Sequence, residues 1–190
     1  MILFFLKTKR KLVGFLNRKI CKFKIFELKN LYPKRILINE ELSFGKLFSI
    51  SFDLSSSVVE IKKNVSFRDF CRIRSGENSK LEIGENVFFN NGCSINCLSG
   101  IQIGNDCQFG EDVKLYDHNH SYKNAELNIN KQGYTFGSIK VGNNCWISSN
   151  VTILKGVEIG DNVVIGAGCI IYQSVPSNST IISKQVLEVK

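Results

Sequence analysis

The sequence lacks a hydrophobic run long enough to cross a membrane. The apolar stretch at its start, Met1–Leu6, has six residues before Lys7, whereas a membrane-spanning helix needs about 20. This stretch also lacks the order of a secretory signal, in which a basic segment comes first and a longer apolar segment follows. We therefore expect neither a membrane span nor a signal peptide here.

Histidine is scarce, and the cysteines lack the spacing of a metal or redox site. The 190 residues include two histidines and seven cysteines, with no C-x-x-C pair. Five cysteines recur at one position of a regular pattern, where a thiol serves as a compact apolar side chain: Cys71, Cys93, Cys107, Cys145 and Cys169. We interpret these as structural, and their number as typical of a reducing cytoplasm. No recognised nucleic-acid-binding module is present, so we expect no such partner.

An aliphatic or aromatic residue recurs at every sixth position in blocks between Ile61 and Ile171. The longest block has six consecutive anchors: Val141, Ile147, Ile153, Ile159, Ile165 and Ile171. Val or Cys usually lies four residues after an anchor, while Gly, Asn and Asp cluster between anchors, as turns require. A period of six suits neither an amphipathic helix nor a long alternating strand. It predicts short strands joined by tight turns, three sides to a coil, with each coil burying its apolar face against the next.

Residues 141–157 (VGNNCWISSNVTILKGV) and 159–168 (IGDNVVIGAG) carry this pattern in its clearest form. They resemble the hexapeptide-repeat acyltransferases, and the similarity extends over residues 57–180. The resemblance implies an all-β solenoid, a left-handed parallel β-helix, that assembles as a homotrimer with acyl-coenzyme A bound between neighbouring subunits. Because parallel crossovers are usually right-handed, the expected handedness comes from the resemblance and not from the spacing. We expect the β-helix over residues 51–181 and a C-terminal tail over residues 182–190.

The segment before the β-helix, residues 1–50, is expected to be basic and helical. Residues 1–46 carry twelve Lys/Arg and three Glu, so the net charge of +8 belongs to this end of the chain. Apolar residues follow a helical spacing: Leu12, Phe15, Leu16, Ile20 and Phe23. Two interpretations stay open. We favour a helix that caps the open end of the solenoid, because terminal repeats need a cover; the alternative is peripheral contact with an anionic inner membrane surface.

The repeat is interrupted by a loop excursion over residues 116–138, and both histidines of the chain lie at its start. Long loops in compact proteins are usually functional. By the resemblance, a histidine here is the general base that takes a proton from the acceptor hydroxyl, a role that suits a neutral imidazole near neutral pH. His118 ranks first because it follows the repeat directly. His120 would share its face on a strand, so which of the two is the base stays open.

Neighbouring side chains of the same loop extend this candidate site. Asp117 could orient an imidazole by accepting its second N–H, although sequence neighbours rarely have the right geometry, and a backbone carbonyl could serve equally well. Tyr116 and Tyr122 could stack against a sugar ring.

The resemblance also implies a donor site. Trp146 would line the acyl-donor channel, Ser149 and Ala167 would lie along the pantetheine on successive coils, and glycines would let that chain approach the backbone. Lys184 could meet the nucleotide phosphates, although the family's usual Gly-x-Pro-Ala-Lys/Arg ending is replaced here by ISKQ. The candidate donor-binding residues are Trp146, Ser149, Gly166, Ala167, Gly168 and Lys184.

A metal site is a further possibility because some hexapeptide-repeat proteins resemble γ-class carbonic anhydrases. Those enzymes need three imidazoles around zinc, whereas this chain offers His118 and His120 alone. We therefore expect no metal.

The leading hypothesis is an acetyl-CoA-dependent O-acetyltransferase acting in the cytoplasm. It would transfer the acetyl group directly, in a ternary complex, to a sugar hydroxyl of a surface polysaccharide (capsule or O-antigen) or its precursor. Two alternatives remain: an acetyltransferase for another small acceptor, such as an amino sugar, serine or an antibiotic, and a non-catalytic solenoid that binds partners.

Overall fold

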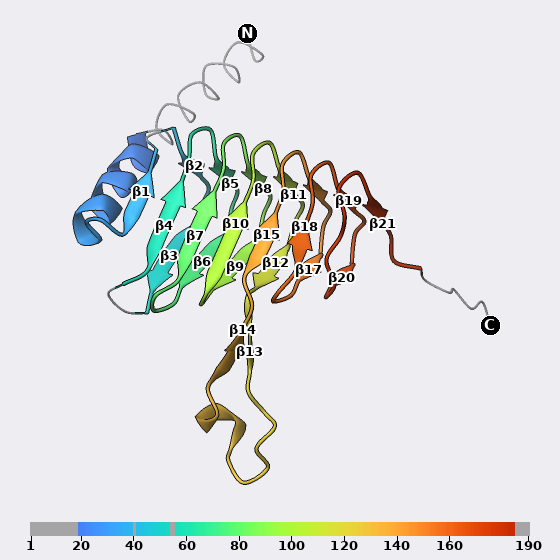
Figure 1. Ribbon diagram of the computed structural model, residues 1–190. Helices are drawn as coiled ribbons and strands as arrows, with labels where there is room; N and C mark the ends of the chain where they lie inside the picture. The colour runs from blue at the N-terminus through green and yellow to red at the C-terminus, as the bar shows by residue number, and fades with distance from the viewer. Residues whose placement is uncertain (1–18, 40, 54–55, 185–190) are drawn as a thin grey trace, which may run out of the picture.

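The computed structural model describes residues 19–39, 41–53 and 56–184. In this part the chain winds into a left-handed parallel β-helix, whose short strands stack along one axis (Figure 1). The all-β solenoid that the six-residue period predicts is therefore confirmed.

The coils build three parallel sheets, which we name A, B and C. Sheet A contains, in stacking order, β1 (Ile36–Ile38), β4 (Val58–Ile61), β7 (Lys80–Ile83), β10 (Gly100–Ile103), β15 (Ile139–Val141) and β18 (Glu158–Ile159). Sheet B contains β2 (Ser43–Phe44), β5 (Ser66–Phe67), β8 (Phe88–Phe89), β11 (Gln108–Phe109), β16 (Trp146–Ile147), β19 (Val164–Ile165) and β21 (Thr180–Ile181). Sheet C contains β3 (Ser49–Phe52), β6 (Arg72–Ser75), β9 (Ser94–Cys97), β12 (Lys114–Tyr116), β17 (Thr152–Ile153) and β20 (Ile170–Ile171).

The repeat anchors stay in register from coil to coil. Ile61 pairs with Ile83, Ile83 with Ile103, and Val141 with Ile159. Ile61 and Ile83 are 22 positions apart in sequence, whereas Val141 and Ile159 are 18 apart. Extra residues therefore enter at the corners and leave the inward-facing anchors stacked.

Aromatic side chains form a stack inside the coils. Ring centroids lie 4.9 Å apart between Phe48 and Phe67, 4.5 Å between Phe67 and Phe89, and 4.5 Å between Phe89 and Phe109. All four rings are buried, as are the Val and Cys side chains four residues after the anchors, and all seven cysteines are free. The cysteines that recur in the repeat thus fill the core, which agrees with their structural interpretation.

The corner between sheets A and B shows the turn chemistry that the sequence predicts. Six residues there have positive φ, a conformation that Asn and Asp adopt more readily than other side chains: Asn64, Asn86, Asp106, Asn144, Asn162 and Asn178. Their side chains bond along the stack, because the amide of Asn86 donates to Asp106 at 2.8 Å and that of Asn144 donates to Asn162 at 2.9 Å.

The stack begins at β1, earlier than the residue 51 at which the repeat count starts the β-helix. Ile38 pairs with Ile61 across a step of 23 residues, and this longer coil conceals the six-residue spacing that continues through Phe44 and Ile50. The first coil is also packed differently. Leu42 and Phe48 occupy its small-residue positions and are buried, whereas the anchors Phe44 and Ile50 are only partly buried.

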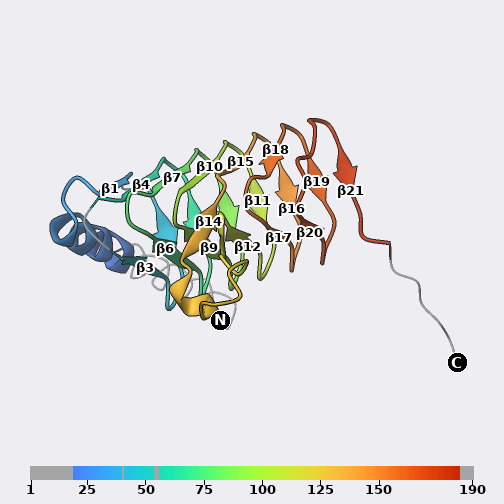
Figure 2. The ribbon, with the colours of Figure 1, turned by 60° about the horizontal axis from the view of Figure 1, so that its bottom comes forward.

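A helix over residues 19–31 lies across the first coil at the end of the stack (Figures 1 and 2). Its buried face consists of Cys21, Ile25 and Leu28. Ile20 and Phe23, which the sequence places on the apolar stripe, are instead 57% and 64% exposed. The other members of that stripe, Leu12, Phe15 and Leu16, lie outside the described residues. The helix thus covers the end of the core, but through a different face from the expected one.

Within residues 19–39, 41–53 and 56–184, no helix combines the length and the apolar character that a bilayer span requires.

Candidate functional site

The interruption of the repeat forms an arm that projects from the body of the solenoid (Figure 1). The chain leaves after β12, forms β13 (His118–His120), passes through the 3₁₀ turn η1 (Ile129–Lys131) and returns through β14 (Tyr134–Phe136) to β15. The strands β13 and β14 pair antiparallel, with His118 opposite Phe136 and His120 opposite Tyr134. The expected excursion over residues 116–138 is therefore a two-stranded ribbon with a loop at its tip.

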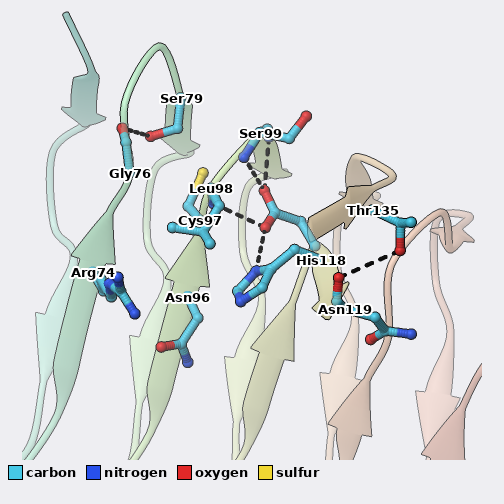
Figure 3. Close-up of polar contacts among 12 residues, drawn as sticks. Arg74, Gly76, Ser79, Asn96, Cys97, Leu98, Ser99, His118, Asn119 and Thr135 are labelled. Carbon is cyan, nitrogen blue, oxygen red and sulfur yellow. Dashed lines mark hydrogen bonds and ion pairs between the residues drawn. The ribbon is translucent and has the colours of Figure 1, made fainter. Parts of the chain in front are cut away.

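A buried carboxylate, that of Asp117, anchors the base of this arm. Its oxygens accept three consecutive backbone N–H groups, from Leu98 at 2.9 Å, Ser99 at 2.7 Å and Gly100 at 2.8 Å (Figure 3). These N–H groups belong to the tight turn between β9 and β10 in the preceding coil, and converging backbone N–H groups of this kind form an anion-binding nest. Because the side chain is 0% exposed and its partners are donors, the arrangement suits an ionised carboxylate.

The same carboxylate holds the imidazole of His118. Asp117 Oδ1 lies 3.0 Å from His118 Nδ1, and the His118 side chain is 13% exposed. Since an ionised carboxylate only accepts hydrogen bonds, the contact favours the tautomer of the neutral imidazole in which Nδ1 donates and Nε2 keeps its lone pair. Asp117 and His118 thus have the geometry for this contact although they are neighbours in sequence, because the chain bends out of the coil between β12 and β13.

Aromatic rings surround this imidazole. The ring of Tyr134, from the returning strand, lies edge-on to His118 with centroids 5.4 Å apart, and Tyr116 lies on another side at 6.3 Å. His120 is exposed and packs against the same tyrosine at 4.6 Å. Tyr134 therefore contacts both histidines, although the sequence assigned it no role. The pairing of an aromatic return strand with His-x-His is the signal that could have identified it.

Two hollows flank the arm. One, of about 660 Å³, is lined by His120, Tyr122 and Lys155 among others. The other, of about 590 Å³, is lined by Arg74, Leu98, Ser99, Tyr134 and Phe136 among others. Arg74 pairs with Asp53 at 2.8 Å, and this contact raises the pKa of the guanidinium.

A row of side chains on sheet C, to which the sequence assigned no common site, lies near the arm, and Arg74 of this row lines one hollow. Arg74 and Asn96 occupy corresponding positions on β6 and β9, in the same row as Tyr116 on β12. Figure 3 shows Arg74, Asn96 and His118 along one side of this sheet. Register across three coils, and not spacing within one, brings them together.

A buried thiol lies beneath the same turn. Burial, and secondarily the charge of Asp117, raise the pKa of Cys97 to about 12. Such a thiol stays protonated and is a poor nucleophile. Among the described residues, no group of three or more His, Cys, Asp or Glu side chains forms a candidate metal centre.

The candidate donor residues lie elsewhere on the solenoid. Trp146 is 56% exposed on the outer face of sheet B. Ser149 and Ala167 occupy equivalent positions on successive coils at the next corner, where Gly168 N–H donates to the Ser149 carbonyl at 2.9 Å. Gly168 has a φ of +72° and open space where a side chain would project. Gly166 lies beside Ala167, and Lys184 is exposed at the end of the described chain.

The structure thus forms two separate groups within one chain. Asp117, His118 and His120 stand at the corner that follows sheet C, whereas Trp146 lies on sheet B and Ser149 at the corner between sheets B and C. The first group comes from one stretch of chain that the preceding coil holds through Asp117, and the second spreads over successive coils.

Known proteins resemble this chain in sequence and in fold. A family model described as "Bacterial transferase hexapeptide (six repeats)" matches residues 138–173. A putative acetyltransferase of Schizosaccharomyces pombe is 30% identical over 154 residues, covering 80% of this chain and 68% of that protein. The chain therefore belongs to the hexapeptide-repeat transferase family.

Two further proteins are similar over part or most of the chain. Galactoside O-acetyltransferase of Escherichia coli (strain K12) is 39% identical over 100 residues, which cover 53% of this chain and 48% of that protein. The similarity thus spans about half the length of that relative. The crystal structure of NeuO, a polySia-specific acetyltransferase, has a TM-score of 0.64 at 23% identity, covering 82% of this chain and 76% of that one. This likeness shows the fold.

Proposed function

We propose that the protein is an acetyl-CoA-dependent acetyltransferase that acetylates a sugar hydroxyl, with His118 as the general base. The observation that carries the proposal is the Asp117–His118 contact of 3.0 Å, held by three backbone N–H groups. It leaves Nε2 of the neutral imidazole as a proton acceptor at the head of the arm, and neighbouring residues of the arm line two hollows that can take an acceptor. The name galactoside O-acetyltransferase supports the transfer of acetyl groups to sugar hydroxyls, and the name of the Schizosaccharomyces pombe relative supports acetyl transfer.

The proton balance of the reaction assigns His118 two steps. Nε2 takes the proton of the acceptor hydroxyl as the oxygen attacks the thioester carbonyl, and the imidazolium then gives this proton to the departing sulfur. Asp117 stabilises the imidazolium between these steps, because its negative charge lies 3.0 Å from Nδ1. The products are the acetyl ester and the free thiol, and His118 returns to its starting state.

Acetyl-CoA would supply the acetyl group, and the residues on sheet B and its next corner fit such a co-substrate. An exposed indole on a sheet face is covered when a ligand lies on it, and the open space beside Gly168 admits a chain close to the backbone. Trp146, Ser149, Gly166, Ala167, Gly168 and Lys184 would hold the donor.

The separation of these residues from the arm supports a site shared between copies. We propose a homotrimer in which the arm of one subunit reaches the donor residues of its neighbour. Mixing His118→Ala subunits with Trp146→Ala subunits should then restore about a quarter of wild-type turnover, because random assembly creates sites with both intact residues. Turnover that stays at the level of either variant alone would reject the shared site.

The choice between the two histidines is testable. His118→Ala should lower kcat by about 10²–10⁴-fold, whereas His120→Ala, at an exposed ring without the buried carboxylate, should chiefly raise KM for the acceptor. Turnover is followed as release of the coenzyme A thiol. If His120→Ala abolishes turnover and His118→Ala does not, the assignment is reversed.

The acceptor class is tested with a panel: a galactoside, maltose, oligosialic acid, glucosamine, serine and an aminoglycoside. Acetylation of a sugar hydroxyl supports the proposal and a role in surface polysaccharide synthesis. Preference for the amine of glucosamine, or for serine or the antibiotic, would instead favour the alternative acceptor class. The free, buried thiols fit a cytoplasmic location.

A further inference from the structure

The helix over residues 19–31 has two apolar faces, and only one of them is needed to cap the solenoid. Cys21, Ile25 and Leu28 are buried against the first coil. Polar contacts secure the same side: Cys21 Sγ donates to the Phe44 carbonyl at 3.5 Å, and Lys24 Nζ donates to the Phe48 carbonyl at 2.9 Å. This face therefore accounts for the packing of the helix on the core.

The other apolar face points away from the solenoid. Ile20, Phe23 and Phe26 are 57%, 64% and 63% exposed. They lie three residues apart, so they are neighbours on the helix surface. Figures 1 and 2 show that the helix stands at the end of the stack, with its outer side facing no other element of the described chain. Large apolar side chains gathered on an outer surface mark an interaction site.

Charge identifies the partner that this face fits. The helix carries four Lys and one Glu; Lys24 is bonded on the buried side, and Glu27 is exposed on the outer side, four residues after Phe23. Lys22 is exposed and Lys29 partly exposed, two turns apart along the border of the apolar face. A second copy docked on the same face would bring these positive charges together, whereas an anionic lipid surface attracts them. Phenylalanine beside lysine on one helix is the composition of helices that lie in the membrane interface.

We propose that this helix docks the protein peripherally on an anionic membrane surface. Ile20, Phe23 and Phe26 enter the boundary between headgroups and acyl chains, and Lys22 and Lys29 contact the lipid phosphates. Capping and docking are thus simultaneous roles of opposite faces of one helix. Docking leaves the arm and the candidate donor residues free, so it does not depend on the proposed acetyl transfer.

Sedimentation of the full-length protein with vesicles tests the proposal. Vesicles of phosphatidylcholine containing about a quarter phosphatidylglycerol should bind the protein, and pure phosphatidylcholine should bind it much more weakly. Raising the salt concentration should weaken binding, because salt screens exposed charges. Phe23→Ser with Phe26→Ser should weaken binding by at least about tenfold. Lys22→Gln with Lys29→Gln should weaken it by about 25-fold on the anionic vesicles.

The matched control is Ile170→Ser with Tyr172→Ser, which removes two exposed apolar side chains, 62% and 70% exposed, at the other end of the solenoid. Its vesicle binding should equal that of the wild type. All variants should keep the wild-type circular dichroism, because the changed side chains are exposed or partly exposed. Wild-type binding by the Phe23/Phe26 variant, or equal binding to neutral and anionic vesicles, overturns the proposal. Self-association that the same variant abolishes, without vesicle binding, would assign the face to a second copy instead.

Discussion

Replacing Asp117 by Asn tests the link between the buried network and the candidate base. The side chain keeps its shape but exchanges one oxygen for an NH₂ group that cannot accept hydrogen bonds. If NH₂ faces Ser99 and Gly100, two backbone N–H groups lose their acceptor; if it faces Leu98 and His118, only one does. The second orientation is therefore preferred. In it NH₂ donates to His118 Nδ1, so the proton of the imidazole moves to Nε2.

Two magnitudes follow from this geometry. One buried N–H without an acceptor costs about 1–3 kcal/mol, and the remaining bonds to a neutral amide are about half as strong as those to a carboxylate. The free energy of unfolding should thus fall by about 2–5 kcal/mol. An Nε2 that carries a proton cannot act as a base, and the equivalent substitution in a serine protease triad lowers kcat by about 10⁴. We expect a loss of about 10³–10⁴ in kcat here.

Urea unfolding and thiol-release kinetics measure the two effects separately. Asp161→Asn is the matched control: this exposed carboxylate also accepts a backbone N–H, from Asn143 at 2.6 Å, but water can replace the bond, so stability should change by less than about 1 kcal/mol. A stability of Asp117→Asn within about 0.5 kcal/mol of the wild type would refute the buried network. Lower stability with unchanged kcat would refute the role of His118 alone.

Two further predictions concern the core. Phe89→Ala should lower the free energy of unfolding by about 3–5 kcal/mol, because the ring is fully buried between two stacked partners. Phe88→Ala, on the outer side of the same strand, should lower it far less. Equal losses of stability in urea unfolding would contradict the stacked core. Burial raises the pKa of the Cys97 thiol from 9.0 to about 12. Between these pH values the thiol ionises in the unfolded chain but stays protonated in the folded protein. The free energy of unfolding therefore falls as the pH rises through this window, by up to about 1.4 kcal/mol per pH unit. Cys97→Ala should show a shallower loss between pH 9 and 10 than the wild type, and parallel stability curves would argue against the raised pKa.

The fold is readable from the sequence because its period is local. Each coil repeats the same anchors, so Val141, Ile147 and Ile153 define three sides without any long-range information. The six-residue period does not reveal the first coil, since the step from Ile38 to Ile61 is longer than that from Val141 to Ile159. Large side chains such as Phe48 also replace the usual Val or Cys there, because this coil meets a helix and not another coil.

The helix itself shows why periodicity alone is ambiguous. Residues 19–31 satisfy helical spacing twice, once through Ile20 and Phe23 and once through Cys21, Ile25 and Leu28. Hydrophobicity favours the first set, which contains an aromatic ring. Contact with the curved end of the first coil selects the second. Which face is buried depends on the shape of the surface that receives the helix, and the sequence of the helix does not contain that shape.

The candidate site likewise contains residues that the sequence identifies and contacts that it does not. His118, His120 and Asp117 are recognisable because they interrupt a regular repeat, but the N–H groups that hold Asp117 come from backbone positions 98–100, where side-chain identity carries no signal. Tyr134 depends on the pairing of β13 with β14 across a loop.

The base of the arm is bonded to the solenoid through both of its strands. The contacts that position His118 are therefore separate from the tip of the arm, whose residues line a hollow. On the outgoing strand the Asp117 carboxylate is bound by the preceding coil; on the return, Gly137 N–H donates to the Asp117 carbonyl and Gly156 N–H donates to the Gly137 carbonyl, both at 2.9 Å. A side chain at Gly137 would meet Gly156 N at 2.9 Å, so the two backbones approach too closely for any other residue. His118 is therefore positioned by backbone contacts with two neighbouring coils, the preceding one and the following one. The tip of the arm contains Tyr122 and η1, and its residues line the hollow beside His120, so its sequence can change the shape of that hollow while His118 stays in place.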